Sequence, residues 1–135
     1  MKIVSTLLIW IAAHSSWEVP PTVPQISYET SEFIEQATGT NGENHLGAVA
    51  AYDHRTNLIL LNETFTPENV REQAVLMHEL VHYLQDEYPY RVYKCRREWE
   101  KEAYELTNLY LEQRGEEPWA NGLTIMFHSM CNPRM

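Results

Sequence analysis

The chain has 135 residues, a formal net charge of −9 and a hydrophobic share of 44%. This length suits one small domain with a single core and leaves no room for separate catalytic and regulatory domains. A strongly acidic surface repels phosphate backbones, so the composition argues against nucleic acid as a partner.

Residues 1–15 have the pattern of a secretory signal peptide. Lys2 precedes the apolar run Ile3–Ala13, and small residues stand at the first and third positions of Ala13-His14-Ser15. We expect cleavage after Ser15. The apolar run is too short to span a bilayer, and the pattern therefore predicts a secreted or periplasmic protein without a membrane span. The alternatives are an N-terminal core helix and an uncleaved anchor.

The next segment, residues 16–26, contains three prolines and predicts a stiff, extended lead. Residues 27–135 are expected to form one domain. Ser27 or Thr30 would cap a short first helix that continues through Ala37 and ends at a turn-rich stretch.

Two short runs of strand character follow, Gly47–Tyr52 and Asn57–Asn62, and the turn residues between them predict a β-hairpin. Within the second run, Leu58–Leu61 shows no alternation of apolar and polar residues. A strand covered on both faces has this pattern.

Two longer helices are expected after the hairpin. Thr66 and Pro67 have the residue types of an N-cap and a first helical position, and this helix should stop before Pro89. The second should run from about Val92 to Arg114. The apolar stretch at residues 123–127 predicts a short helix or a covering segment.

The first of these helices carries the motif His-Glu-x-x-His at His78, Glu79 and His82. Residues four apart lie one above the other on a helix, so both imidazoles can reach one metal ion. Glu79 is displaced around the helix and suits a general base for a water that zinc activates. This combination of residues predicts a Zn²⁺ site and hydrolytic chemistry.

A third protein ligand must come from elsewhere, because Asp86 lies too far along the helix axis from His78. On the second helix, an advance of about 100° per residue places Glu102 between Leu106 and Leu109 in the apolar stripe. A carboxylate among apolar residues needs a compensating charge. We therefore expect Glu102 as the third ligand. Three other glutamates of this helix stand near Glu102: Glu98 is the reserve ligand, Glu105 lies at the edge of the stripe, and Glu100 is expected to point away.

His-Glu-x-x-His followed by a Glu-Ala pair resembles the gluzincin metallopeptidases, of which the thermolysin-like enzymes are the best known. In their pattern nineteen residues separate the second histidine from the glutamate ligand, and here Glu102-Ala103 stands at that spacing after His82. The resemblance implies a minimal α+β zincin-like domain. In it the short helix and the hairpin pack on the motif helix and on a second, glutamate-bearing helix. Lys101 and Leu106 replace an asparagine and an aspartate of the family pattern, so the partner that orients each histidine stays open among Glu98, Glu105 and Asp86.

Cys95 and Cys131 form an even pair in a chain with a predicted signal, which favours one disulfide over metal binding. The candidates to stabilise an oxyanion are Tyr83, Tyr104 and His128. We expect a zinc-dependent peptidase that acts on a peptide or protein. The alternatives are an exported zinc-fold binding or inhibitor protein without catalysis, and a structural zinc site closed by Cys95 or His128.

Overall fold

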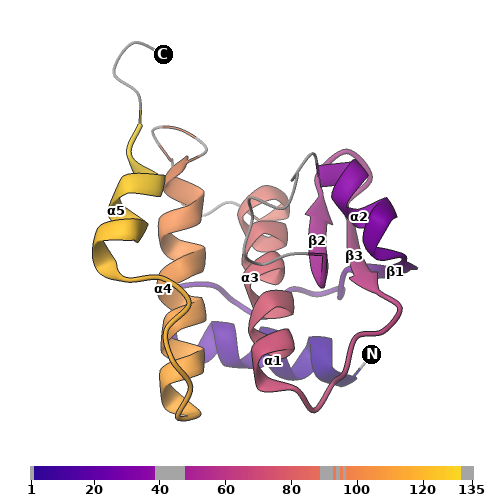
Figure 1. Cartoon of the computed structure of the whole chain (residues 1–135), viewed down its shortest axis with the longest axis horizontal. Coiled ribbons are helices and arrows are strands. Elements are labelled where there is room, and N and C mark those ends of the chain that lie inside the picture. Colours follow the sequence, from indigo (N-terminus) through magenta and orange to yellow (C-terminus); the bar gives the residue numbers. More distant parts are fainter. Residues whose placement is uncertain (1, 39–47, 89–92, 94, 96, 132–135) are drawn as a thin grey trace.

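The computed structural model describes residues 2–38, 48–88, 93, 95 and 97–131, with the side chains of residues 38 and 127–129 outside that description. The fold is mixed α+β. Helices α3 and α4 run side by side, with α5 against α4 and a small sheet on the other side of α3 (Figure 1). The elements are α1 (Lys2–Ala13), β1 (Gln25–Glu29), α2 (Ser31–Thr38), β2 (Ala50–Asp53), β3 (Leu58–Asn62), α3 (Val70–Glu87), α4 (Arg97–Gln113) and α5 (Gly122–Ser129).

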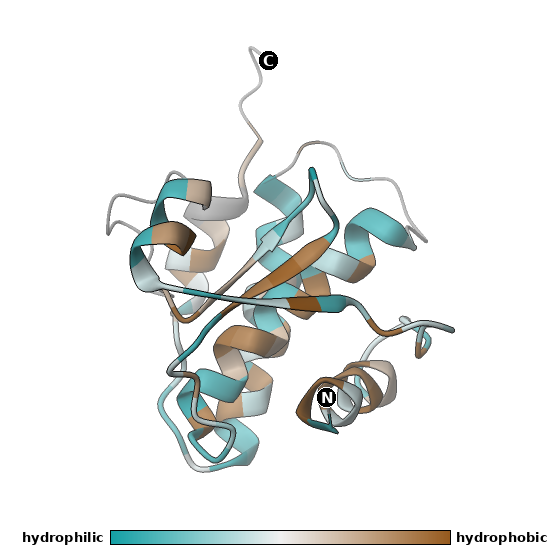
Figure 2. Cartoon of the chain, turned by 90° about the vertical axis from the view of Figure 1, so that its right-hand side faces the viewer, coloured by the Kyte–Doolittle hydropathy of each residue, from teal (hydrophilic) through white to brown (hydrophobic). Residues whose placement is uncertain are grey.

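The sheet has the strand order β1-β3-β2, and β2 pairs antiparallel with β3 as the predicted hairpin. The central strand β3 is buried on both faces, as its apolar run predicts. Ile59 and Leu61 join the core cluster that includes α3, whereas Leu60 packs with Ile34 of α2 on the other face. In Figure 2 the apolar colour accordingly lies along the middle of the sheet.

Strand β1 is a difference from the sequence-based expectation, which treats residues up to 26 as an extended lead. It pairs in parallel with β3, with Gln25 opposite Leu58 and Glu29 opposite Asn62. Trp17 in the preceding segment is also buried in the core. Pairing with a distant strand is a tertiary event that the local pattern of this proline-rich segment does not reveal.

Helix α3 begins later than predicted, because Asn69 rather than Thr66 is its N-cap. The Asn69 side chain accepts a hydrogen bond from the backbone N–H of Glu72, while Thr66 donates its own N–H to the Glu72 carboxylate. The helix ends at Glu87, before Pro89 as predicted.

Helix α4 starts after Cys95 and is followed by Gly115, whose φ of 74° is the left-handed conformation that glycine adopts readily at a helix C-terminus. The predicted start at Val92 falls outside the described residues. The predicted disulfide is confirmed: Cys95 and Cys131 are bonded, which ties the end of α5 to the start of α4. The stretch at residues 123–127 lies within α5.

Helix α1 packs into the core. Val4, Leu7, Leu8 and Ile11 are each at most 1% exposed and belong to the same cluster as the buried face of α3. Trp10 adds a directional contact, because its indole N–H donates to the side-chain oxygen of Gln113 on α4. The described residues include no helix long and apolar enough to cross a membrane.

Removal of residues 1–15 should lower the free energy of unfolding by several kcal/mol, because each buried apolar side chain of α1 contributes about 1.5–3 kcal/mol. Thermal and urea unfolding of chains 1–135 and 16–135 measure the difference. Equal stability of the two chains would show that α1 adds nothing to the folded domain, as expected of a signal peptide. The matched control is Ile9→Ala, at a position of α1 that is 59% exposed.

Candidate metal centre

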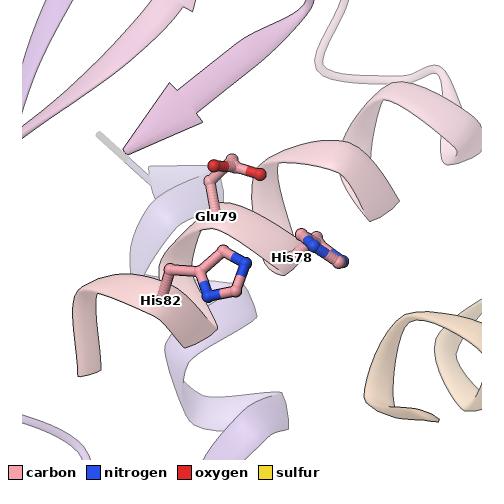
Figure 3. A group of neighbouring side chains, drawn as sticks. All are labelled: His78, Glu79 and His82. Carbon is pink, nitrogen blue, oxygen red and sulfur yellow. The ribbon is translucent and has the colours of Figure 1, made fainter. Parts of the chain in front are cut away.

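His78 and His82 stand on one face of α3, as their spacing predicts, with ring centroids 4.9 Å apart. Potential ligand atoms of His78, Glu79 and His82 all lie within 4.8 Å of one another. Figure 3 shows the two imidazoles on the same side of the helix, with the Glu79 carboxylate turned toward the neighbouring strand. His78 is 1% exposed, so the core holds one of the two rings firmly in place.

Glu100 of α4 completes this cluster. Its Oε1 lies 2.9 Å from His82 Nε2, and its Oε2 lies 3.3 Å from His78 Nε2. The carboxylate therefore bridges the two rings on the side where a metal ion would be bound. Here the structure corrects the sequence-based assignment, because Glu100 occupies the place that we expected for Glu102.

The error comes from the position of the buried stripe on α4. The residues buried there include Tyr104, Thr107 and Leu111, which the sequence-based stripe leaves out. With about 100° per residue, these additions move the centre of the buried face toward the direction of Glu100 and leave Glu102 at its edge. The predicted stripe is misplaced because Thr107 carries no hydrophobic signal and because the stripe omits Tyr104 and the apolar Leu111.

Glu102 belongs instead to a neighbouring polar cluster. Its Oε1 accepts hydrogen bonds from Gln85 Nε2 at 3.0 Å, from Tyr93 Oη at 2.9 Å and from Trp17 Nε1 at 3.3 Å. Glu102 thus contacts Gln85, and Gln85 in turn contacts His82.

Each histidine has a partner on its Nδ1. For His78 this is Thr107 Oγ1 at 3.1 Å, and for His82 it is Gln85 Oε1 at 2.8 Å. Neither partner is among the acids that the sequence suggests. Gln85 is three residues beyond His82 on the same helix, a spacing that brings side chains together and would have identified it. Thr107 is reached only through the packing of α4 on α3.

The partners determine which ring nitrogen carries the proton. Thr107 donates its hydroxyl hydrogen to the Ala103 carbonyl at 2.6 Å, so toward His78 it can only accept. Gln85 likewise presents its amide oxygen to His82. Both rings therefore donate from Nδ1, and in the neutral tautomer both Nε2 atoms direct lone pairs at the Glu100 carboxylate. Such an arrangement requires a cation or additional protons between them.

The pKa values show the strength of this attraction. Burial acts to lower the pKa of His82, but the hydrogen bond and the charge of Glu100 outweigh it, and the pKa rises to about 9. For Glu100, burial acts to raise the pKa, yet the hydrogen bonds and charges of the two histidines hold it far below its ordinary value. The same electrostatic field that favours a proton here favours a metal ion.

Glu79 is fixed against the sheet. Its Oε1 accepts the backbone N–H of Tyr52 on β2 at 2.9 Å. Burial, the largest influence, raises the pKa of Glu79 despite the opposing charges of His82 and His78. The carboxylate is thus held beside the histidines by a strand at the edge of the described sheet and has an increased affinity for a proton.

The other candidate residues are distributed around this cluster. The Tyr104 ring packs on the His78 ring with centroids 4.7 Å apart, and burial together with the charges of Glu100 and Glu79 raises the pKa of Tyr104 to about 12. Tyr83 directs its hydroxyl to the Thr22 carbonyl at 3.5 Å, and the side chain of His128 lies outside the described residues. Asp86 accepts a hydrogen bond from the Tyr52 hydroxyl at 2.6 Å. Because Thr107 and Gln85 are the Nδ1 partners of the two histidines, none of the three acids expected to orient the rings has that role: Asp86, Glu98 and Glu105.

The chemistry of these side chains is compatible with a zinc ion. Zinc bonds of about 2.0–2.2 Å in a tetrahedral site place neighbouring ligand atoms about 3.3 Å apart. The distances of 3.3 Å and 2.9 Å run from the two different oxygens of Glu100, one to each histidine nitrogen, so a metal ion between the rings would need one oxygen to turn toward it. Two imidazole nitrogens and one carboxylate are also a donor set that zinc accepts in catalytic sites.

Fold and site together define a small α+β domain with a candidate His-His-Glu metal centre between two helices. The chain belongs to a protein family described as a domain of unknown function, DUF6647, whose model matches residues 1–135. The comparison with curated proteins found no match, and neither did the comparison with solved structures.

Proposed function

We propose that this protein is a zinc-dependent hydrolase of a secreted or periplasmic compartment, as its disulfide supports, and specifically a peptidase of minimal zincin-like architecture. His78, His82 and Glu100 would hold the ion, and Glu79 would act as general base and then as general acid. The observation that carries the proposal is the convergence of two Nε2 atoms and one carboxylate beside Glu79, with the Nδ1 atom of each ring held by its own partner.

Zinc in this place would supply a Lewis acid and would lower the pKa of a water to about 7. Glu79 would act as the general base and then as the general acid: its carboxylate takes a proton from the attacking water and passes it to the leaving amine. The hydrogen bond from Tyr52 N–H keeps one oxygen of Glu79 in place while the other serves the proton transfer.

A peptide as substrate is supported by strand β2. It lies at the edge of the described sheet, and its Tyr52 N–H points away from β3, toward the centre. Extended peptides bind strand edges through main-chain hydrogen bonds. A peptide placed along β2 would bring its carbonyl groups close to Glu79 and the histidines.

Metal content and peptide cleavage together test the proposal. Mass spectrometry of the purified full chain should find one zinc per molecule, and a broad peptide library should be cleaved by the zinc-loaded sample and not after chelation. A chain without zinc under zinc-replete conditions would refute the proposal. Stoichiometric zinc without cleavage of any peptide would favour the non-catalytic binding protein.

A structural zinc site closed by Cys95 is contradicted, because Cys95 is bonded to Cys131. Closure by His128 falls outside the described side chains. Chelation distinguishes a structural zinc ion from a catalytic one. Removal of a structural ion should unfold the protein, whereas removal of a catalytic ion should leave the helical circular dichroism signal unchanged.

A further inference from the structure

Gln85 links the metal centre to the polar cluster around Glu102. It is 1% exposed, and its amide nitrogen donates to two groups that can only accept, the Trp99 carbonyl at 3.0 Å and the Glu102 carboxylate at 3.0 Å. With the nitrogen held on that side, the amide oxygen must face His82. A flipped amide would turn its oxygen toward these two acceptors and lose both hydrogen bonds.

Glu102 is itself held from two other parts of the chain. The Trp17 indole and the Tyr93 hydroxyl both donate to the oxygen that accepts from Gln85. Neither donor comes from α3 or α4. The carboxylate therefore joins the segment after α1 and the segment before α4 to the helix that carries the histidines.

We propose that Glu102 is a positioning residue for the metal centre: it fixes the amide orientation of Gln85 and thereby keeps the proton of His82 on Nδ1, with Nε2 directed at Glu100. Its effect on metal affinity rests on the proposed function; its effect on the His82 proton does not. This assigns to Glu102 a role distinct from that of a ligand.

The test follows the His82 Nδ1–H proton in the metal-free full chain by ¹H–¹⁵N NMR with labelled histidine. In the wild type this proton donates to a buried acceptor and should exchange slowly with water. In Glu102→Ala the Gln85 amide nitrogen keeps one acceptor, the Trp99 carbonyl. The exchange of the His82 Nδ1–H proton with water should then accelerate about 10-fold, because one buried hydrogen bond that holds the amide in place is lost. Glu105→Ala removes an exposed glutamate from the same helix and serves as the matched control.

Glu102→Gln distinguishes positioning from bulk packing. Its side-chain oxygen can still accept from Gln85, Tyr93 and Trp17, so slow exchange should return. Gln85→Met keeps the side-chain length but removes the amide, and it should lose the protected proton even if Glu102→Ala does not fold. Exchange in Glu102→Ala or Gln85→Met as slow as in Glu105→Ala would overturn the proposal.

Zinc affinity gives the second measurement. Competition with a chelator should show about 10-fold weaker binding for Glu102→Ala, the lower end of what outer partners of metal ligands contribute, and near-normal binding for Glu102→Gln. If the wild type binds no zinc, the proposed function fails, while the proton-exchange result still decides whether Glu102 orients His82. Unchanged affinity in Glu102→Ala with intact wild-type binding would overturn the positioning role alone.

Discussion

Glu100→Ala should lose zinc binding by at least about 100-fold, more than the roughly 10–100-fold typical of residues that only orient a ligand. The reason is geometric: Glu100 supplies the one carboxylate that lies within 3.3 Å of both histidine Nε2 atoms among the described residues. Two histidines alone do not make a tight zinc site. Metal analysis after dialysis, together with chelator competition, measures the loss.

Glu105→Ala is the control for Glu100→Ala, since it removes an exposed carboxylate from the same helix. It should bind zinc like the wild type. The loss of zinc affinity should be largest in Glu100→Ala, smaller in Glu102→Ala and absent in Glu105→Ala. A reversal of the first two would restore Glu102 as the ligand and would show that the contacts of Glu100 are only those of an ion pair.

The metal-free protein offers an independent measurement of the same contact. Glu100 raises the pKa of His82 to about 9, whereas burial alone acts to lower it. In Glu100→Ala the pKa of His82 should therefore fall below 9, and an NMR titration of the ring measures it. An unchanged pKa would mean that Glu100 does not face His82 in solution.

Glu79→Gln should retain zinc and lose hydrolysis by a factor of about 10²–10⁴, the usual contribution of a general acid–base group. Glutamine has nearly the same shape, and its oxygen can still accept the Tyr52 N–H, so the side chain should stay in place. It cannot take a proton at neutral pH. Rates on a cleaved library peptide, measured beside zinc content, separate the two effects.

Wild-type rates of peptide hydrolysis in Glu79→Gln would contradict the proposed role of Glu79. The control is Glu63→Gln, which makes the same replacement at an exposed position outside α3 and α4 and should leave both rate and zinc content unchanged. Loss of zinc together with activity in Glu79→Gln would instead assign Glu79 to the ligand set, a role its position beside both histidines permits.

The parts of this protein that depend on neighbours along the chain could be predicted from sequence. The spacing of His78 and His82 places both rings on one helix face because the helix repeat is local. The hairpin of β2 and β3 follows from short-range turn chemistry, and the burial of β3 on both faces follows from its continuous apolar run. The disulfide could be predicted because an even pair of cysteines stands in a chain whose first residues resemble a signal peptide.

The tertiary structure decided the rest, because contacts between distant segments depend on which faces of the elements meet. Glu100 rather than Glu102 reaches the histidines because α4 packs through a face that includes Thr107 and Leu111, and only the tertiary contacts show that this face is centred there. Thr107 meets His78 for the same reason. Strand β1 exists because β3 offers a free edge to a segment whose own pattern predicts no strand.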